Sequence, residues 1–494
     1  MTKCVVGAGW LILGSYGCKQ VMGWEEATWW GEGGSGGEAG QSSSSGGAGG
    51  MGGDAGAGGM AGMAGAGGIA GMGGAGGMGG GGAGGSGCMT EADCPAVANA
   101  TRTCTNGVCG FTCNNGFGDC TAAAGCETVL TNNRNHCGAC GNACAAYCAG
   151  TECNDPVSIA GGYHHHCAVM TNGDVYCWGR NEKGELGDGT LGSKPVPTKV
   201  KGLPGPAVQV DGGASATQNN YTPKTCAALV NGEVWCWGEG NGTPTKVGGL
   251  ANIKEVSVGD AHLCAVSKTG TLYCWGSNSY GQVGDGGTGY AAVPVQITSN
   301  VLHISAGGKH TCAVVTGGAL QCWGDNGDGQ LGIGSFLGKQ SPTVVEGIAN
   351  VSAVRCANSH TCAFAGDALY CWGANQVGQL GTGNINSSSV PKAVNLPGVE
   401  AIAVSYNFSA AVTDGTLSMW GFNSSGQLGT GMTNTVYSPM AVALMDVQAI
   451  GLASTSSCAL LKNREIRCWG ANTYGQLGNG GIQQKLLPTL ISWP

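Results

Sequence analysis

Seven Trp-Gly dipeptides divide the C-terminal two-thirds of this 494-residue chain into near-copies of a single unit. The intervals between successive tryptophans are 59, 38, 48, 49, 48 and 49 residues. A chain that repeats with a period near 50 residues forms a β-propeller or a solenoid, because each copy buries its apolar face against the next copy. The tryptophans are Trp178, Trp237, Trp275, Trp323, Trp372, Trp420 and Trp469.

The pattern inside one unit indicates β-strands. Residues 304–324 contain two alternating apolar runs on either side of Gly317, which is typical of a β-hairpin. A Gly-rich loop with Leu or Val between two glycines follows, as in residues 326–334, and a run containing Pro then begins an outer strand, as in residues 341–345. Four strands per unit is the size of a propeller blade. The sequence therefore predicts an all-β, seven-bladed β-propeller over residues 157–494.

Cysteines occur in pairs, with one cysteine on each strand of a predicted hairpin. In the sixth unit Ser409 and Met419 stand at the two positions, so both cysteines are absent together. Joint presence and joint absence predict a cross-strand disulfide in each of the other six units. Because disulfides persist only in oxidising compartments, the pattern also predicts export. The predicted pairs are Cys167–Cys177, Cys226–Cys236, Cys264–Cys274, Cys312–Cys322, Cys362–Cys371 and Cys458–Cys468.

The N-terminus supports export by a separate route. Residues 1–18 contain one basic residue, Lys3, then an apolar run and small residues before Cys18. This pattern predicts an export signal, with Cys18 as the lipid-modified first residue of a bacterial lipoprotein. The alternative is a wrongly assigned start followed by a disordered tail. Residues 19–87 predict a disordered tether, because residues 31–87 consist almost entirely of Gly, Ala, Met and Ser; this part alone has a reach of roughly 40 Å.

Residues 88–153 hold twelve cysteines within 66 residues. This density is typical of a small disulfide module that cannot build a sufficient core unaided. Cys137 and Cys140 could instead form half of a zinc site, but no second Cys-x-x-Cys follows them, and His136 is the only histidine of this segment. The pairing leaves Cys356 alone on an apolar strand, where we expect a buried, unreactive thiol.

The repeated unit resembles a known family. The pattern of His two residues before the first Cys, the Cys-Trp-Gly run and the following Asn-x-x-Gly-Gln-Leu-Gly loop is similar to the repeat of the regulator of chromosome condensation superfamily. The resemblance covers residues 157–494 and implies a seven-bladed propeller. Hairpin cysteines resemble those of exported bacterial members. The second unit departs from the pattern, because residues 238–247 lack the Gly-Gln-Leu-Gly loop and residues 212–224 are inserted before it.

Charge and motifs argue against several classes of function. The net charge is −8, and residues 157–494 hold 17 Lys and Arg against 18 Asp and Glu, without the basic surface that nucleic-acid binding requires. No run of 18 apolar residues exists. We find no catalytic constellation, cofactor motif or metal set, so the chain is not expected to be an enzyme. The acidic residues Asp285, Asp325 and Asp328 lack the alternation of a calcium loop.

The histidines follow the repeat as well. His165, His262, His310 and His360 share one position in the unit, which favours packing and hydrogen bonding to a neighbouring loop over metal binding. His164 and His166 stand outside this position, and we expect both on the surface.

A binding site is expected where the repeat is broken, because unbroken positions are committed to the fold. The candidate binding loop contains Asn219, Asn220 and Tyr221 in the insertion, with Glu239 in the shortened loop beside it. The alternative for the insertion is a disordered solvent loop.

The preferred function is an exported, tethered, monomeric propeller that binds a protein or glycan through one face. It would lie on the outer membrane or cell surface as a lipoprotein, with membrane contact only through the lipid, or be secreted. Alternatives are guanine-nucleotide exchange on a small GTPase, which the disulfides disfavour, inhibition of an enzyme in the manner of a β-lactamase inhibitor, and a lyase, for which no acid/base pair is evident.

Overall fold

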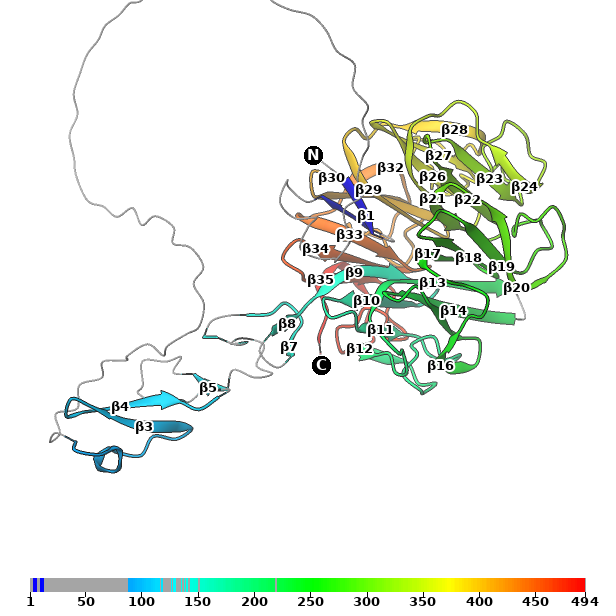
Figure 1. Ribbon diagram of the computed structural model, residues 1–494. Coiled ribbons are helices and arrows are strands. Elements are labelled where there is room, and N and C mark those ends of the chain that lie inside the picture. The colour runs from blue at the N-terminus through cyan, green and yellow to red at the C-terminus, as the bar shows by residue number, and fades with distance from the viewer. Residues whose placement is uncertain are drawn as a thin grey trace, which may run out of the picture.

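The computed structural model describes residues 3–6, 9–12, 88–115, 117–118, 126, 128–129, 135, 137, 139–140, 143–149, 152–217 and 220–493. Cys18, the tether and Asn219 lie outside these residues. Within them, no helix has the length and apolar character needed to cross a membrane. Figure 1 shows seven β-sheets arranged as blades around a common axis. The fold is thus all-β, as the repeat predicts.

Each blade is a four-stranded antiparallel sheet whose strands follow one another in sequence from the axis outward. Blades 1 to 3 comprise β9 (Pro156–Gly161), β10 (His165–Met170), β11 (Val175–Gly179) and β12 (Lys194–Lys199); β13 (Ala207–Thr217), β14 (Asn220–Leu229), β15 (Val234–Gly238) and β16 (Asn241–Lys246); and β17 (Ile253–Val258), β18 (His262–Ser267), β19 (Leu272–Gly276) and β20 (Ala291–Thr298). Blades 4 and 5 comprise β21 (Val301–Ala306), β22 (His310–Val315), β23 (Leu320–Gly324) and β24 (Lys339–Val344); and β25 (Val351–Cys356), β26 (His360–Ala365), β27 (Ala368–Gly373) and β28 (Ser388–Val394). Blades 6 and 7 comprise β29 (Val399–Ser405), β30 (Phe408–Thr413), β31 (Thr416–Gly421) and β32 (Val436–Ala441); and β33 (Val447–Leu452), β34 (Ser456–Leu461), β35 (Ile466–Gly470) and β36 (Lys485–Leu490).

The described residues before the propeller form short elements. They are the hairpin β1 (Lys3–Val6) with β2 (Gly9–Ile12), the 3-10 helix η1 (Glu91–Asp93), and the pairs β3 (Ala100–Thr105) with β4 (Val108–Cys113), β5 (Phe117–Gly118) with β6 (Thr128–Val129), and β7 (Tyr147–Ala149) with β8 (Glu152–Asn154). The Cys-rich segment contains the disulfides Cys88–Cys104, Cys94–Cys109, Cys113–Cys126, Cys137–Cys148 and Cys144–Cys153. It joins blade 1 through Ala146, which packs with Met170 and Tyr176.

Disulfides bond the two middle strands of six blades, as the cysteine spacing predicts. Cys312 and Cys322, for example, are directly opposite across β22 and β23. Cys356 is the free cysteine among the described residues, and it is buried. Burial raises the pKa of its thiol to about 12, so the thiolate is not available at neutral pH.

The assignment of Ser409 to the first cysteine position of the sixth blade is wrong. In blade 6, Met419 is opposite Ala410, and Ser409 is opposite Trp420. In blade 4 the residue opposite the tryptophan, Trp323, is Thr311, so Ser409 is the equivalent of Thr311 and not of a cysteine. The cause is the turn at Asp414 and Gly415, which is one residue shorter and moves the register by one. The pair of positions that lost its cysteines is therefore Ala410 and Met419.

A contact that we term the loop clamp joins successive blades. The Gly-Gln-Leu-Gly loop of one blade covers the Trp-Gly tryptophan of the next blade. In five blades the indole Nε1 of that tryptophan donates a hydrogen bond of 2.8–3.0 Å to a backbone carbonyl of the loop, which belongs to Gln in four blades and to Glu185 in the fifth. A Thr or Ser hydroxyl beside the indole donates to the same oxygen over 2.7–2.9 Å. The loop residue Leu331 and its equivalents are fully buried. Gly284, at φ +90°, has no room for a side chain, since a Cβ would lie 2.4 Å from Nε1 of Trp323.

The repeated histidines also connect neighbouring blades. Nε2 of His310 lies 2.9 Å from the Thr361 hydroxyl, and His165, His262 and His360 make the same contact at 2.8–2.9 Å with Thr225, Thr311 and Ser409. Burial lowers the pKa of His310 to about 3, so the ring is neutral. The histidines therefore hydrogen-bond to the next blade rather than to a loop.

The surface placement expected for His166 is wrong. Its side chain is fully buried, and its Nε2 lies 3.0 Å from the Ser456 hydroxyl of blade 7. His166 occupies the hydroxyl position and Ser456 the histidine position, so the roles are exchanged at the junction that closes the ring. His164 is half-buried and stacks on Tyr474.

The ring closes without exchange of a strand between blades. All four strands of blade 7 and of blade 1 are contiguous in sequence. The closing contacts are backbone hydrogen bonds of 2.9 Å from Ser454 N to the Tyr163 carbonyl and from Gly480 N to the Pro195 carbonyl, together with Trp493 packing edge-on against Trp178. Packing and hydrogen bonds alone therefore hold the first and last blades together.

Candidate functional site around the central pocket

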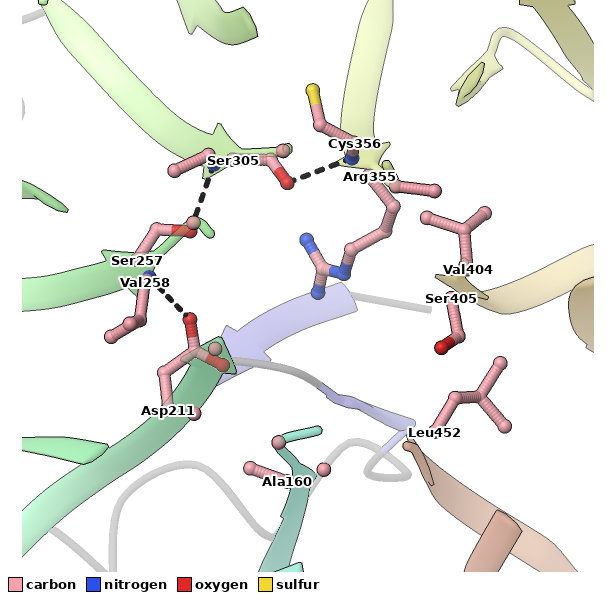
Figure 2. Close-up of a pocket in the computed structure, with 18 of the residues that line it drawn as sticks. Ala160, Asp211, Ser257, Val258, Ser305, Arg355, Cys356, Val404, Ser405 and Leu452 are labelled. Atoms are coloured by element: carbon pink, nitrogen blue, oxygen red, sulfur yellow. Dashed lines mark hydrogen bonds between the residues drawn. The ribbon is translucent and has the colours of Figure 1, made fainter. Parts of the chain in front are cut away.

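A pocket of about 150 Å³ opens at one end of the propeller axis, between the first strands of the blades. Its wall is polar over blades 2 to 5, where the fifth residues of the inner strands are Asp211, Ser257, Ser305 and Arg355. Over blades 6, 7 and 1 the wall is mainly small or apolar, with Ala403, Val404, Ile450, Gly451, Leu452 and Ala160. Figure 2 shows the guanidinium of Arg355 directed into the space between these walls. The pocket is therefore suited to a group that is polar on one side.

Two carboxyl groups in this pocket are hard to ionise. Burial raises the pKa of Asp211 to about 7, although its carboxylate accepts a 2.8 Å hydrogen bond from Val258 N, as drawn in Figure 2. Burial likewise raises the pKa of Asp260 to about 7, and the Tyr406 hydroxyl lies 3.5 Å from it. Both carboxyl groups thus exchange protons near neutral pH.

Arg355 supplies the one guanidinium among the described residues of the pocket wall. Burial lowers its pKa, and its Nη1 donates to the carbonyl of Val354 over 2.9 Å. No carboxylate of the part of the chain that the structure describes lies within 4.0 Å of it. A guanidinium held this way keeps most of its donors for a carboxylate, a phosphate or a backbone carbonyl.

The mouth of the pocket, which we call the rim, is formed by the turns between the first and second strands of the blades and by the loops after the third strands, which hydrogen-bond to these turns, as from Arg180 N to the His164 carbonyl. Aromatic and cationic side chains meet there: Tyr163 packs edge-on against Tyr406 with ring centroids 5.3 Å apart, and Arg180 lies 4.9 Å over the Tyr474 ring. On another side, Lys309 lies 4.4 Å over Tyr280. Tyr and Arg are the residues that contribute most to protein interfaces. The rim thus has the composition of a contact surface.

The candidate binding loop is a hairpin rather than a loop. Strands β13 and β14 continue beyond the rim, with Thr217 opposite Asn220 and Ala216 opposite Tyr221. Gly212 and Gly213 line the pocket, so the extension begins at the rim itself. Figure 1 shows that these two strands are longer than the first two strands of the other blades. The described residues of the insertion therefore form a β-ladder.

Glu239 stands at the foot of this hairpin. It has φ 53° in the turn between β15 and β16, and its carboxylate is 3.0 Å from Nζ of Lys224. The structure thus brings Glu239 next to the insertion in the ladder, as its position in the sequence suggests. A role of these residues in binding stays a prediction.

The pocket residues were missed by sequence reasoning. The sequence does contain a signal for them: the fifth residue of the inner strand is small and uncharged in five blades and charged in the other two. Aligning the seven inner strands by their register with the second strands gives Ala160, Asp211, Ser257, Ser305, Arg355, Ala403 and Gly451. Asp211 and Arg355 are the two charged departures from this series.

Disulfides occupy most of the cysteines in the cysteine and histidine clusters of the described residues. The three groups close enough to hold an ion are Cys88 with Cys94 and Cys109, Cys137 with Cys144 and Cys153, and His310 with Cys312 and Cys356. Every member of the first two groups is disulfide-bonded, as are Cys140 and Cys312. The Cys137-x-x-Cys140 pair therefore offers no thiolates for zinc while it is oxidised.

Family models identify the repeat. The regulator of chromosome condensation (RCC1) repeat matches residues 172–217, 269–314, 318–364, 367–412, 414–460 and 468–494, which is over half of the chain. The chain belongs to the RCC1 repeat family. A second model of the same repeat matches residues 157–185, 253–282, 301–330 and 454–476 of this RCC1 propeller. Residues 218–252, which hold most of blade 2, lie between the matches.

Curated relatives share part of this RCC1 propeller. The ultraviolet-B receptor UVR8 of Arabidopsis thaliana is 34% identical over 153 residues, covering 28% of this chain and 33% of the receptor. The E3 ubiquitin-protein ligase HERC2 of Homo sapiens is 29% identical over 147 residues, covering 26% of this chain and 3% of the ligase. The match thus spans a third of the first relative and a small fraction of the second.

Solved structures of RCC1 propellers have the same fold. Prp20p from Saccharomyces cerevisiae superimposes with a TM-score of 0.56 at 20% identity, covering 65% of this chain and 86% of that one. Yeast RCC1 (Prp20) in its complex with Kap60 gives a TM-score of 0.54 at 22% identity, covering 60% and 78%. At these identities the likeness concerns the fold alone.

We predict that Asp211→Asn stabilises the protein at alkaline pH. The folded-state pKa of Asp211 lies above the ordinary value of 3.8, so its stabilising contribution is present at acidic pH and is lost as the pH rises through about 7. Asparagine keeps an oxygen that accepts from Val258 N and carries no charge. The variant should gain about 1–3 kcal/mol over the parent between pH 4.5 and pH 8, measured by guanidinium unfolding. Asp446→Asn, at an exposed position, is the control; parallel pH profiles for Asp211→Asn and the parent would contradict the assignment.

Proposed function

We propose that this RCC1 propeller is an exported, surface-tethered protein that binds a protein partner through the rim and the β13–β14 hairpin. The observation that carries the proposal is that the longest insertion into the repeat rises from the rim of the pocket. Unbroken repeat positions serve the fold, whereas additions to a rigid scaffold are where binding residues gather. The Tyr, His and Arg side chains of the rim favour a protein over the glycan alternative.

The disulfides support the proposed location. Six blades carry a hairpin disulfide, and further disulfides join the Cys-rich segment. Such a number is typical of oxidising compartments. The number of disulfides also disfavours guanine-nucleotide exchange, because that function needs a partner in a reducing compartment. Prp20p, which shares the fold, binds Gsp1p and histones. We further propose that Cys18 carries the lipid and that residues 19–87 hold the propeller away from the membrane.

The rim is tested by site-specific photo-crosslinking in the living source cell. A photoreactive residue at Asn407, which is exposed in a rim turn, should yield one dominant cross-linked protein product. The matched control is the same residue at Tyr437, which is 46% exposed on the outer strand β32. Equal cross-linking from both positions, or none from Asn407, would exclude the rim as the binding surface.

Export is tested by the intact mass of the full chain made with its own N-terminus in a bacterium. We expect a mature chain that begins at Cys18 with added acyl mass and has one thiol, that of Cys356, available to an alkylating agent after denaturation. Cys18→Ser should abolish the acyl mass. An uncleaved chain with all 27 cysteines of the sequence reduced would refute export.

A further inference from the structure

Blade 2 is the one blade of the described propeller that gives no loop clamp to its neighbour. Its chain passes from β15 through Glu239 and Gly240 directly into β16. The tryptophan that follows, Trp275, is 8% exposed, whereas the other six Trp-Gly tryptophans are at most 2% exposed. A pocket of about 370 Å³ lies over Trp275, between Val247 of blade 2 and Ala292, Val293 and Pro294 of β20. We call this space the Trp275 slot.

The slot presents hydrogen-bonding groups that five other blades satisfy through the clamp. In those five blades the indole Nε1 donates to a loop carbonyl, but Nε1 of Trp275 has no acceptor among the described residues. Nε1 of Trp178 has none either, but the loop of blade 7 buries that indole completely, whereas Trp275 is open to the slot. A loop Gly N–H also donates to the second residue of the next outer strand, as from Gly286 to the Gln340 carbonyl at 3.0 Å. The register makes Ala292 the equivalent of Gln340. No backbone N–H of blade 2 that the structure describes donates to the Ala292 carbonyl.

The junction between blades 2 and 3 is held without a clamp. The Gln209 amide binds the backbone of Val256 twice, donating to its carbonyl over 2.8 Å and accepting from its N–H over 2.7 Å. Asp211 adds the bond to Val258 N at 2.8 Å. These contacts lie at the inner strands, away from the slot. The slot is therefore not needed for closing the ring, and Val293 at its edge is 67% exposed.

We propose that the Trp275 slot binds a tight turn of a partner protein that carries an aliphatic side chain between two glycines. The chain itself shows this chemistry six times, because each clamp places a Leu or Val between glycines against the next tryptophan. The slot lies at the equivalent position between blades 2 and 3, the one described junction where no loop covers the tryptophan. A partner turn would bury its aliphatic side chain on Trp275, accept from Nε1 and donate to Ala292. This inference rests on the proposed protein-binding function and adds a second contact to it.

A cyclic peptide tests the slot without the natural partner. The probe is the loop of blade 4, Asn-Gly-Asp-Gly-Gln-Leu-Gly-Ile-Gly, closed head to tail and titrated into the full chain by calorimetry. We expect one-to-one binding with a Kd below about 1 mM. Replacing the Leu of the peptide by Asp should weaken binding about tenfold or more, because Leu burial is lost. Trp275→Phe should weaken it about three- to tenfold, because the N–H donor and part of the aromatic surface are lost while a smaller ring remains.

Variants at exposed positions locate the binding. Val293→Arg should abolish binding, whereas Val344→Arg, on an exposed part of the outer strand β24, should leave it unchanged. No binding at 1 mM peptide, or equal binding to Val293→Arg and the parent, would overturn the proposal. Neither result affects the rim cross-link, which tests the proposed function separately.

The tether is the competing occupant, since it carries apolar side chains beside glycines. In the full chain, Ile69 and the tether methionines can be changed to Ser, namely Met22, Met51, Met60, Met63, Met72 and Met78. We expect the affinity for the cyclic peptide to stay within about twofold of the parent. A tenfold gain would show that the tether fills the slot within the same chain and would overturn the partner assignment.

Discussion

The loop clamp is the interaction on which this propeller depends. A single carbonyl oxygen accepts both from an indole Nε1 and from a Thr or Ser hydroxyl of the next blade, while a buried Leu or Val fills the space beside them. This contact explains why the Trp-Gly pairs and the Gly-Gln-Leu-Gly loops occur in step along the sequence. In six blades a disulfide bonds the two middle strands. The clamp connects every blade except blade 2 to the next, and buried neutral histidines add contacts at several of these junctions. The ring consequently closes with no exchange of strands.

The repeat made most of the fold predictable from sequence. Seven Trp-Gly pairs gave the number of blades, and the cysteine spacing gave the hairpin register, because a disulfide requires residues that are directly opposite. The errors came from single-residue shifts and from the ring itself. Ser409 was misplaced because a shortened turn moves the register, and His166 was misplaced because its partner, Ser456, is 290 residues away on the last blade.

The candidate site was less predictable because it exists only when the ring is closed. Asp211 and Arg355 are on different blades, and nothing near either residue in sequence indicates that both face one pocket. The insertion was located correctly, but its extension as a β-ladder depends on pairing across ten residues that show no strong alternation. Both sites that we associate with binding involve blade 2. Its hairpin is lengthened at the rim, and its loop clamp is missing over Trp275, so one blade departs from the repeat at two places.

Hydrogen exchange of the tryptophan indole N–H groups tests the loop clamp most directly. In the folded, ¹⁵N-tryptophan-labelled chain, assigned by single Trp→Phe substitutions, the indoles of Trp237, Trp323, Trp372, Trp420 and Trp469 should exchange slowly, because each donates to a buried carbonyl. The indole of Trp275 should exchange at least about tenfold faster than these five, because it lies open in the slot. Equal protection of Trp275 and the five clamped indoles would contradict the account.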